Sequence, residues 1–309
     1  MKQKLILDVD TGLDDAIGII LALKSQQFNV LGITTVNGNV SLETATHNTC
    51  KILDLLNEQS VSVIKGASAP IVRETFFEHA IHGEDGLGGA LKGFEVLKKP
   101  DEGFAPDFII RSILNFPEEV TLVMTGPLTN LALAIKKCPE IVKHVKEVIF
   151  MGGVVKGPGN VTPTAEYNTY VDPEAARIVL QAGFESLTQV GLDVTRRVLL
   201  KDTHIDAIDN EILASYIRES TNDYFVRYFE RNNVRGCAMH DPLAVGVALQ
   251  RSLVVTENYF VDVETKSELC DGQLVCDFQN RLKRPANLNV CVDVDEKAFF
   301  DLFIRIFNS

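Results

Sequence analysis

Short apolar runs of β type alternate with stretches of helical spacing through the first two thirds of the chain, and this alternation limits the folds open to it. In the helical stretches, apolar residues recur every three or four positions. Such alternation favours a parallel sheet covered by helices on both faces. We therefore predict an α/β fold with an open, mostly parallel (mixed), Rossmann-like sheet. In sheets of this kind the ligand binds at the carboxyl ends of the strands.

The expected elements fall into two groups. Strands are predicted over Lys4–Val9, Val30–Val36, Val61–Ile64, Val120–Met124, Val145–Phe150 and Leu187–Val190, and helices over Asp14–Lys24, Leu42–Leu56, Pro127–Lys136 and Pro173–Ala182. Two of the helices begin with proline, which favours the first helical position, and Asp172 is the predicted N-cap of the last one.

The chain shows no feature that divides it into separate domains. It has no low-complexity linker, charge run or repeat period within its 309 residues, so we expect one domain over residues 1–309. Two less regular segments, about residues 66–105 and 220–240, are predicted to be mobile loops beside the substrate.

The charge balance bears on the class of partner. The chain carries 30 basic and 42 acidic residues, a net charge of −12, which argues against binding to a nucleic-acid backbone or an anionic membrane. The first residues, MKQKLILDVDTG, lack the apolar core of a signal peptide, and no stretch reaches the roughly 18 apolar residues of a membrane span. We expect a cytoplasmic protein with six reduced cysteines, since these form no C-x-x-C pair.

Polar residues gather where the predicted strands end. They are Asp10, Asp14 and Asp15 after the first strand, Asn37 and Asn39 after the second, Thr125 and Asn130 further on, then Asn160, Glu166, Asn168 and Asp193, and finally His240 and Asp241. Since the carboxyl ends of parallel strands meet at one edge of the sheet, these residues are the candidate site.

The acidic pattern of the first strand and turn predicts a metal ion. Asp8 and Asp10 share one face of an apolar strand, where an unpaired carboxylate is costly to bury. No Lys or Arg occurs within Leu5–Leu23, so a cation is the economical partner. Carboxylates without neighbouring thiolates or imidazoles favour Ca²⁺ or Mg²⁺ over zinc. The alternative is a solvated turn whose acids interact with a helix dipole.

The tripeptide at residues 240–242 combines an imidazole with an acid and a proline. We predict a helix that begins here, with Asp241 as its N-cap and Pro242 as its first residue. This explains the acid but not His240, which ionises near neutral pH and suits work as a general acid.

Together these residues resemble a known family. The decapeptide LDVDTGLDDA at residues 7–16 is similar to the signature of the inosine–uridine-preferring nucleoside hydrolases. Further motifs follow in the family's order over nearly the whole chain: NGN at 37–39, TGPLTN at 125–130, MGG at 151–153, the set Asn160, Glu166 and Asn168, and HDP at 240–242.

The resemblance implies an enzyme that hydrolyses the N-glycosidic bond of ribonucleosides with a tightly bound Ca²⁺. The implied metal ligands are Asp10, Asp15, Asp241 and the main-chain carbonyl of Thr125, completed by water and the ribose 2′- and 3′-hydroxyls. Asp10 would also be the base that deprotonates the attacking water, and His240 would lie beside the leaving base. The residues implied to hold the ribose are Asp14, Asn39, Asn160, Glu166 and Asn168.

We expect the preference of the enzyme for one nucleobase over another to depend on the segments at about residues 66–105 and 220–240. His82 is similar to bacterial members of the family that favour uridine and cytidine, and the chain has no Trp for a purine sandwich. Tyr228, with the neighbouring Tyr224 and Phe225, is a further candidate for base contact. We predict a pyrimidine preference, with broad inosine and uridine specificity as the alternative. The resemblance also implies a homo-oligomer, either a tetramer or a dimer.

Two rival classes share some of these features. A haloacid-dehalogenase-type phosphatase also opens with D-x-D and uses Mg²⁺, but its motif requires Thr or Val where Gly12 stands. A non-catalytic nucleoside-binding protein would be marked by loss of Asp10 or His240, and both are present.

Overall fold

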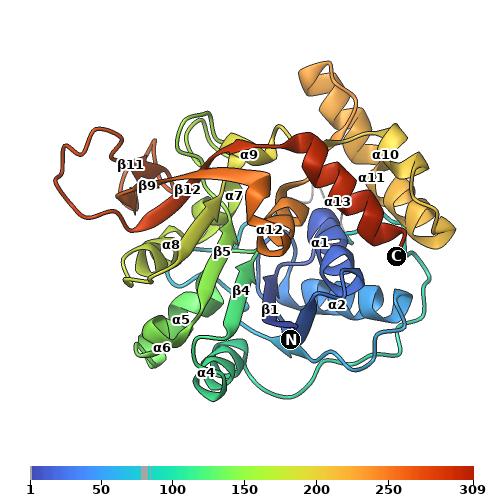
Figure 1. Cartoon of the computed structure of the whole chain (residues 1–309), viewed down its shortest axis with the longest axis horizontal. Coiled ribbons are helices and arrows are strands. Elements are labelled where there is room, and N and C mark those ends of the chain that lie inside the picture. Colours follow the sequence, from blue (N-terminus) through green and yellow to red (C-terminus); the bar gives the residue numbers. More distant parts are fainter. Residues whose placement is uncertain (1, 78–82, 84) are drawn as a thin grey trace.

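The computed structural model describes residues 2–77, 83 and 85–309, and these fold around an eight-stranded sheet (Figure 1). Its order is β3-β2-β1-β4-β5-β6-β12-β9. The strands are β1 (Gln3–Val9), β2 (Phe28–Thr35), β3 (Val63–Lys65), β4 (Val120–Met124), β5 (Glu147–Met151), β6 (Leu187–Val190), β9 (Val254–Tyr259) and β12 (Leu288–Val294). Neighbours from β3 to β12 are parallel, whereas β9 runs antiparallel to β12 at the edge. The predicted fold class is confirmed.

Helices cover both faces of this sheet, and each face has its own hydrophobic core. One core contains α1 (Leu13–Lys24), α2 (Leu42–Leu55), α11 (Glu211–Asn232), α12 (His240–Leu249) and α13 (Glu296–Phe307). The other contains α4 (Ala105–Asn115), α5 (Thr129–Lys137), α6 (Ile141–His144) and α8 (Pro173–Leu180). Alternate residues of β1 point to opposite cores, with Leu5 and Leu7 in the first and Ile6 in the second.

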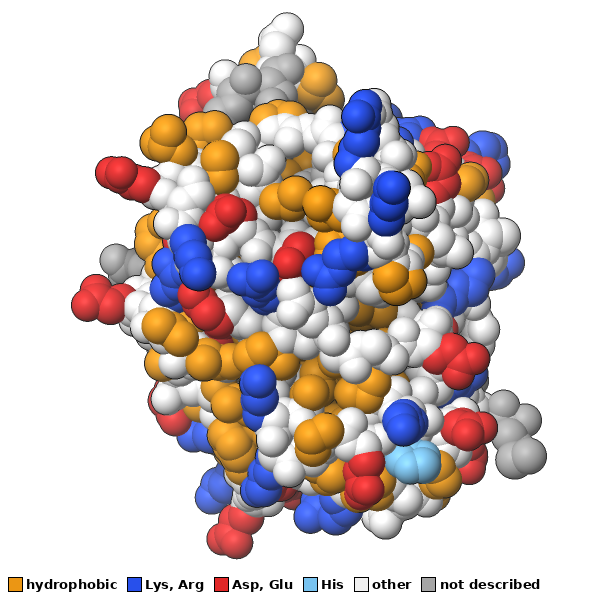
Figure 2. All heavy atoms as spheres, turned by 90° about the vertical axis from the view of Figure 1, so that its left-hand side faces the viewer, with side chains coloured by type: hydrophobic (Ala, Val, Ile, Leu, Met, Phe, Trp, Pro, Cys, Tyr) orange, Lys and Arg blue, Asp and Glu red, His pale blue; other side chains and the backbone are white. Residues whose placement is uncertain are grey.

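Shorter elements complete the chain. They are α7 (Tyr167–Val171), α9 (Leu192–Thr195), α10 (Asp202–Asp206), the 3₁₀ turn η1 (Arg251–Leu253), and two small antiparallel pairs, β7 (Leu199–Leu200) with β8 (Cys237–Ala238) and β10 (Val261–Val263) with β11 (Leu274–Cys276). The region around β11 projects beyond the main sheet (Figure 1). The face on that side carries both signs of charge with hydrophobic side chains between them (Figure 2). None of the helices in the described part of the chain is long and apolar enough to cross a membrane.

The predicted strands and helices lie within two residues of their observed bounds. The prediction of a mobile loop at about 220–240 is wrong for residues 220–232, which form the second half of α11. Asp172 caps α8 as predicted, because its side chain accepts a hydrogen bond from the Ala175 amide (3.0 Å). Pro127 was expected to open a helix, and this is wrong. The first helical hydrogen bond of α5 is accepted by the Leu128 carbonyl, from Ala132 (2.9 Å), so the proline stays in the preceding turn.

Candidate active site

A cavity opens at the carboxyl ends of the central strands. It is lined by Asp14, Asn39, Thr125, Met151, Asn160, Val161, Glu166, Tyr167, Asn168, Tyr224, His240 and Asp241. Most of these are residues that the sequence placed after successive strands, and the parallel topology brings them to one edge of the sheet. Asp10 and Asp15, both almost fully buried, contact residues of this lining from below.

Asp10 follows β1 and is held by the turn after β2. Its Oδ2 accepts a hydrogen bond from the Asn39 amide (2.6 Å). Gly38 makes this approach possible, because a Cβ at that position would lie 2.0 Å from Asp10 Oδ2. The other oxygen, Asp10 Oδ1, is buried and has no hydrogen-bond partner within the described chain. A buried carboxylate oxygen without a donor is energetically costly unless a cation or a proton serves it.

Asp15 lies in the first turn of α1 and is fixed by three donors. The Gly12 amide (2.9 Å) and the Asn39 side chain (3.2 Å) donate to Oδ2, and the Thr125 hydroxyl donates to Oδ1 (2.7 Å). Its carboxylate therefore connects the loops that follow β1, β2 and β4.

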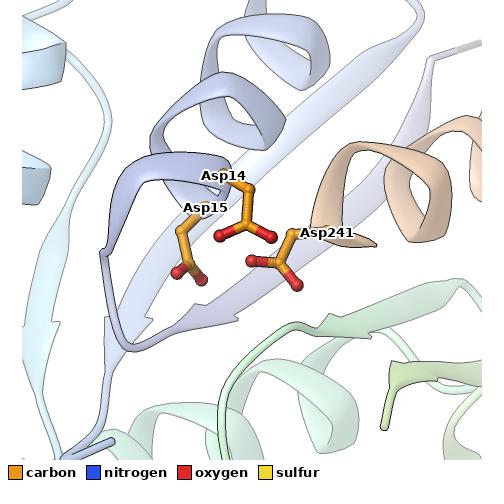
Figure 3. Close-up of side chains that lie close together, drawn as sticks. All are labelled: Asp14, Asp15 and Asp241. Carbon is orange, nitrogen blue, oxygen red and sulfur yellow. The ribbon is translucent and has the colours of Figure 1, made fainter. Parts of the chain in front are cut away.

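Asp14, Asp15 and Asp241 form a compact acidic cluster (Figure 3). One carboxylate oxygen from each lies within 4.8 Å of the others, and Asp14 and Asp241 share a side-chain hydrogen bond. Asp241 therefore does not cap its helix as we predicted. Met239 is the N-cap residue and α12 begins at His240. The Asp241 carboxylate turns towards the acids of α1.

Burial and mutual repulsion alter the ionisation of this cluster. Burial first, and the charge of Asp15 second, raise the pKa of Asp14 to about 7 and that of Asp10 well above its usual range. Burial and then the charge of Asp14 raise the pKa of Asp241. Carboxylates that repel one another in this way suit a divalent cation, which neutralises them and needs oxygen ligands. The donor set therefore fits the predicted metal.

Asp8 has a different environment from the one expected. Its Oδ1 accepts hydrogen bonds from the Thr34 hydroxyl and from Asn130 Nδ2 (2.7 Å), instead of facing a cation. Burial raises the pKa of Asp8 to about 7. These donors from β2 and α5 serve one oxygen of Asp8, whereas Oδ2 is buried without a hydrogen-bond partner within the described residues. Asp8 is not part of the acidic cluster of Asp14, Asp15 and Asp241.

A second wall of the cavity is built from residues 160–168. The Glu166 carboxylate accepts from the amides of Gly153 (2.7 Å), Asn168 (3.0 Å) and Thr169 (3.2 Å), which fixes it at the start of α7. Asn168 Nδ2 donates to the Thr125 carbonyl (2.7 Å). Asn160 accepts from the Tyr167 amide (2.9 Å). The wall thus presents two carboxamides and one carboxylate, groups suited to binding hydroxyls.

His240 closes the cavity from α12. Its Nδ1 lies 2.7 Å from the Thr195 hydroxyl, and its ring lines the cavity. Tyr224, from α11, also lines the cavity and stacks on Tyr228 with the ring centroids 5.8 Å apart. Tyr228, a predicted base contact, packs against Tyr224 but is not among the residues that line the cavity. His82 lies outside the described residues.

Three predicted polar positions do not face the cavity. Asn130 binds Asp8, and Asp193 accepts from the amides of Val155 (3.0 Å) and Lys156 (2.8 Å). Asn37 is buried but absent from the lining. Conversely, the sequence analysis did not single out Tyr167 or Thr195. Tyr167 could have been noticed because it stands between the candidate residues Glu166 and Asn168. No feature of the sequence marked Thr195.

The fold and this site define an α/β enzyme that binds a small polar substrate over a cluster of carboxylates. Within that class, the chain belongs to the inosine-uridine preferring nucleoside hydrolase family, whose family model matches residues 5–301. Its reaction class is accordingly ribonucleoside hydrolysis, the cleavage of an N-glycosidic bond by water.

Individual relatives cover nearly the full length of the chain. It is 37% identical to the pyrimidine-specific ribonucleoside hydrolase RihA of Shewanella woodyi over 99% of this chain and 98% of the relative. It is 36% identical to the inosine-uridine preferring nucleoside hydrolase of Crithidia fasciculata, covering 98% and 97%. Among solved structures, the purine-preferring ribonucleoside hydrolase from Gardnerella vaginalis superposes with a TM-score of 0.91 at 33% identity, covering 99% and 98%.

Proposed function

We propose that this enzyme hydrolyses ribonucleosides to free base and ribose with Asp10 as the base, His240 beside the leaving base and Ca²⁺ as the metal. The observation that carries the proposal is the unpartnered Asp10 Oδ1, buried beneath a cavity whose floor holds three further carboxylates. An unpartnered carboxylate oxygen at this place could accept a proton from a water bound in the cavity.

The proposed metal ligands are Asp10, Asp15, Asp241 and the Thr125 carbonyl. The carbonyl accepts one hydrogen bond from Asn168, so its second lone pair remains for a cation. The set consists only of oxygens, as Ca²⁺ prefers. When bound, the ion would supply Lewis acidity, lowering the pKa of the attacking water and orienting it together with two sugar hydroxyls.

The ribose is proposed to lie between the acidic cluster and the wall at residues 160–168. Asp14 and Asn39 face it from one side, and Asn160, Glu166 and Asn168 from the other. Departure of the base leaves positive charge on the sugar ring, as in glycoside hydrolysis. Fixed carboxylates around the ring stabilise that charge, because their hydrogen-bond donors hold them in place before the reaction.

For the leaving base we propose contacts with His240, Tyr228 and His82. A pyrimidine preference is supported by the RihA relatives and by the absence of Trp. The structural likeness to the purine-preferring Gardnerella enzyme supports the alternative, a broad specificity for inosine and uridine. A homo-oligomer and a cytoplasmic location remain predictions.

The experiment is the release of ribose from uridine, cytidine, inosine and adenosine in phosphate-free buffer. We expect release that is lost after prolonged chelation and restored by Ca²⁺, with uridine and cytidine turned over faster than the purines. Activity that survives complete metal removal would contradict the metal assignment. Equal rates on all four nucleosides would contradict the pyrimidine preference alone.

A further inference from the structure

The hydroxyl of Thr195 contacts the imidazole ring of His240, which lines the cavity. Thr195 is the last residue of α9, directly after β6, and its side chain is fully buried. Within the described chain, the hydrogen-bond partner of its hydroxyl is Nδ1 of His240, at 2.7 Å. The backbone of Thr195 is fixed in turn by a hydrogen bond from its amide to the Gly191 carbonyl (3.1 Å).

This contact bears on which ring nitrogen of a neutral His240 carries the proton. A threonine hydroxyl both donates and accepts, whereas a neutral imidazole has one nitrogen of each kind. If Nδ1–H donated to Thr195, the hydroxyl proton would be left without an acceptor in a fully buried position, which is costly. The favoured arrangement is therefore a hydroxyl that donates to Nδ1, with the ring proton on Nε2.

We propose that Thr195 is a positioning residue, which holds the neutral His240 ring as the tautomer that presents an Nε2–H donor to the departing base. The inference rests on the proposed function, in which His240 lies beside that base. Because Nδ1 is engaged by Thr195, a hydrogen bond from this ring to the substrate comes from Nε2.

The proton balance of the step follows from this tautomer. When the C1′–N bond breaks, its electron pair stays on the base, and the Nε2–H hydrogen bond stabilises the resulting negative charge. The base then takes its proton from solvent, while the attacking water forms the new C1′–O bond and loses one proton to Asp10. His240 keeps its ring proton throughout, so the ring need not pass through an anionic state.

The test compares two leaving groups and two variants in the Ca²⁺-supplied enzyme. Uridine depends on stabilisation of its departing base, whereas 4-nitrophenyl β-D-riboside leaves as a phenolate that needs no such hydrogen bond. We expect Thr195→Val to lower kcat on uridine by about 10- to 100-fold, less than the full loss of a hydrogen-bond donor to developing negative charge, because the ring itself remains. Its kcat on the nitrophenyl riboside should stay within about twofold, and Thr195→Ser should recover most of the uridine rate.

Thr188→Val is the matched control. Thr188 is a buried threonine on β6, and its hydroxyl accepts only long hydrogen bonds, from Arg251 (3.4 Å) and Asn289 (3.5 Å). We expect this variant to keep the ratio of the two rates. Equal losses on both substrates in Thr195→Val, or an unchanged uridine rate, would overturn the inference.

A second measurement does not depend on turnover. In protein labelled with ¹⁵N-histidine, the His240 signals, assigned by their loss in His240→Gln, should show a protonated Nε2 and an unprotonated Nδ1. Thr195→Val should shift them towards a mixture of tautomers. A protonated Nδ1 in the unaltered enzyme would refute the inference. Failure of the unaltered enzyme to release ribose from any nucleoside would instead refute the proposed function, and the tautomer could still be determined.

Discussion

The hydroxyl of Tyr167 lies 2.6 Å from the main-chain carbonyl oxygen of Gly38. It is also 2.8 Å from the carbonyl oxygen of Phe76, so one phenol joins α7, the turn that carries Asn39 and the segment after β3. The Phe76 ring packs on Tyr167 with the centroids 6.1 Å apart. A residue at the cavity wall therefore also fixes the turn that binds Asp10.

Tyr167→Phe should loosen this turn without removing the aromatic ring. We expect the free energy of unfolding to fall by about 1 kcal/mol, the typical cost of one buried hydrogen bond, and KM to rise more than kcat falls. The measurements are urea unfolding and steady-state kinetics on uridine. Tyr170→Phe is the control, since the Tyr170 hydroxyl has no hydrogen-bond partner within the described chain. Equal behaviour of the two variants would show that the Tyr167 hydroxyl has no special role.

Asp10→Asn should retain the fold and lose most of the turnover. The substitution keeps the shape of the side chain and removes one charge from a crowded acidic site, so thermal stability without metal should not fall. We expect kcat to drop by at least about 100-fold, as for loss of a general base. Asp8→Asn is the matched control two residues earlier, because Asp8 binds Thr34 and Asn130 outside the acidic cluster. Near-normal kinetics of Asp10→Asn would remove this residue from the role of base.

The metal-free enzyme should lose stability as the pH rises. The pKa values of Asp8 and Asp14 are raised to about 7 in the fold from an ordinary value of 3.8. The folded state therefore binds more protons than the unfolded state between these values. Stability then falls with rising pH over roughly pH 4–7, by up to about 1.4 kcal/mol per pH unit for each group.

Ca²⁺ should oppose this loss, because it replaces protons in the acidic cluster. We expect the increase in Tm produced by added Ca²⁺ to be larger at pH 8 than at pH 5. Thermal unfolding with EDTA or Ca²⁺ at each pH measures it, with Mg²⁺ as the comparison ion. An increase independent of pH would show that the cation does not bind at the titrating carboxylates.

The fold and most of the cavity could be predicted from the sequence, because strand periodicity fixes which residues follow each strand. Parallel topology then places Asp10, Asn39, Thr125 and Glu166 at one edge without further information. The direction of individual side chains could not be predicted in this way. Asp241 was expected to cap its helix, but its carboxylate is drawn towards Asp14 by contacts between segments more than 200 residues apart.

Long-range contacts also explain why the roles of Thr195 and Asp8 could not be predicted from the sequence. Thr195 becomes relevant only because α12 brings His240 against α9, which no local pattern encodes. Asp8 lies two residues before Asp10, and only the fold shows that donors from β2 and α5 bind its Oδ1.

The segment after β3 offers a last prediction, since an arginine anchors it to two other parts of the fold. Arg73 forms ion pairs with Glu174 of α8 (2.7 Å) and with Asp271 of the β10–β11 connection (2.5 Å), and donates to the Thr265 carbonyl (3.0 Å). The Glu174 contact is bidentate, with Nε donating to Oε2 (3.0 Å) and an Nη donating to Oε1 (2.7 Å), which a lysine cannot reproduce. Because these side chains are only partly exposed, water screens the pairs less than at an open surface.

We therefore expect Arg73→Lys to lower the free energy of unfolding by about 1–2 kcal/mol. Arg218→Lys, at an exposed single pair with Asp206, should lower it by at most about 0.5 kcal/mol. Because the anchored segment runs on to Phe76 and its contact with Tyr167, Arg73→Lys should also raise KM for uridine while kcat changes little. Urea unfolding measures the change in stability, and steady-state kinetics on uridine measure the change in KM. A KM that stays constant while stability falls would limit the role of Arg73 to the fold.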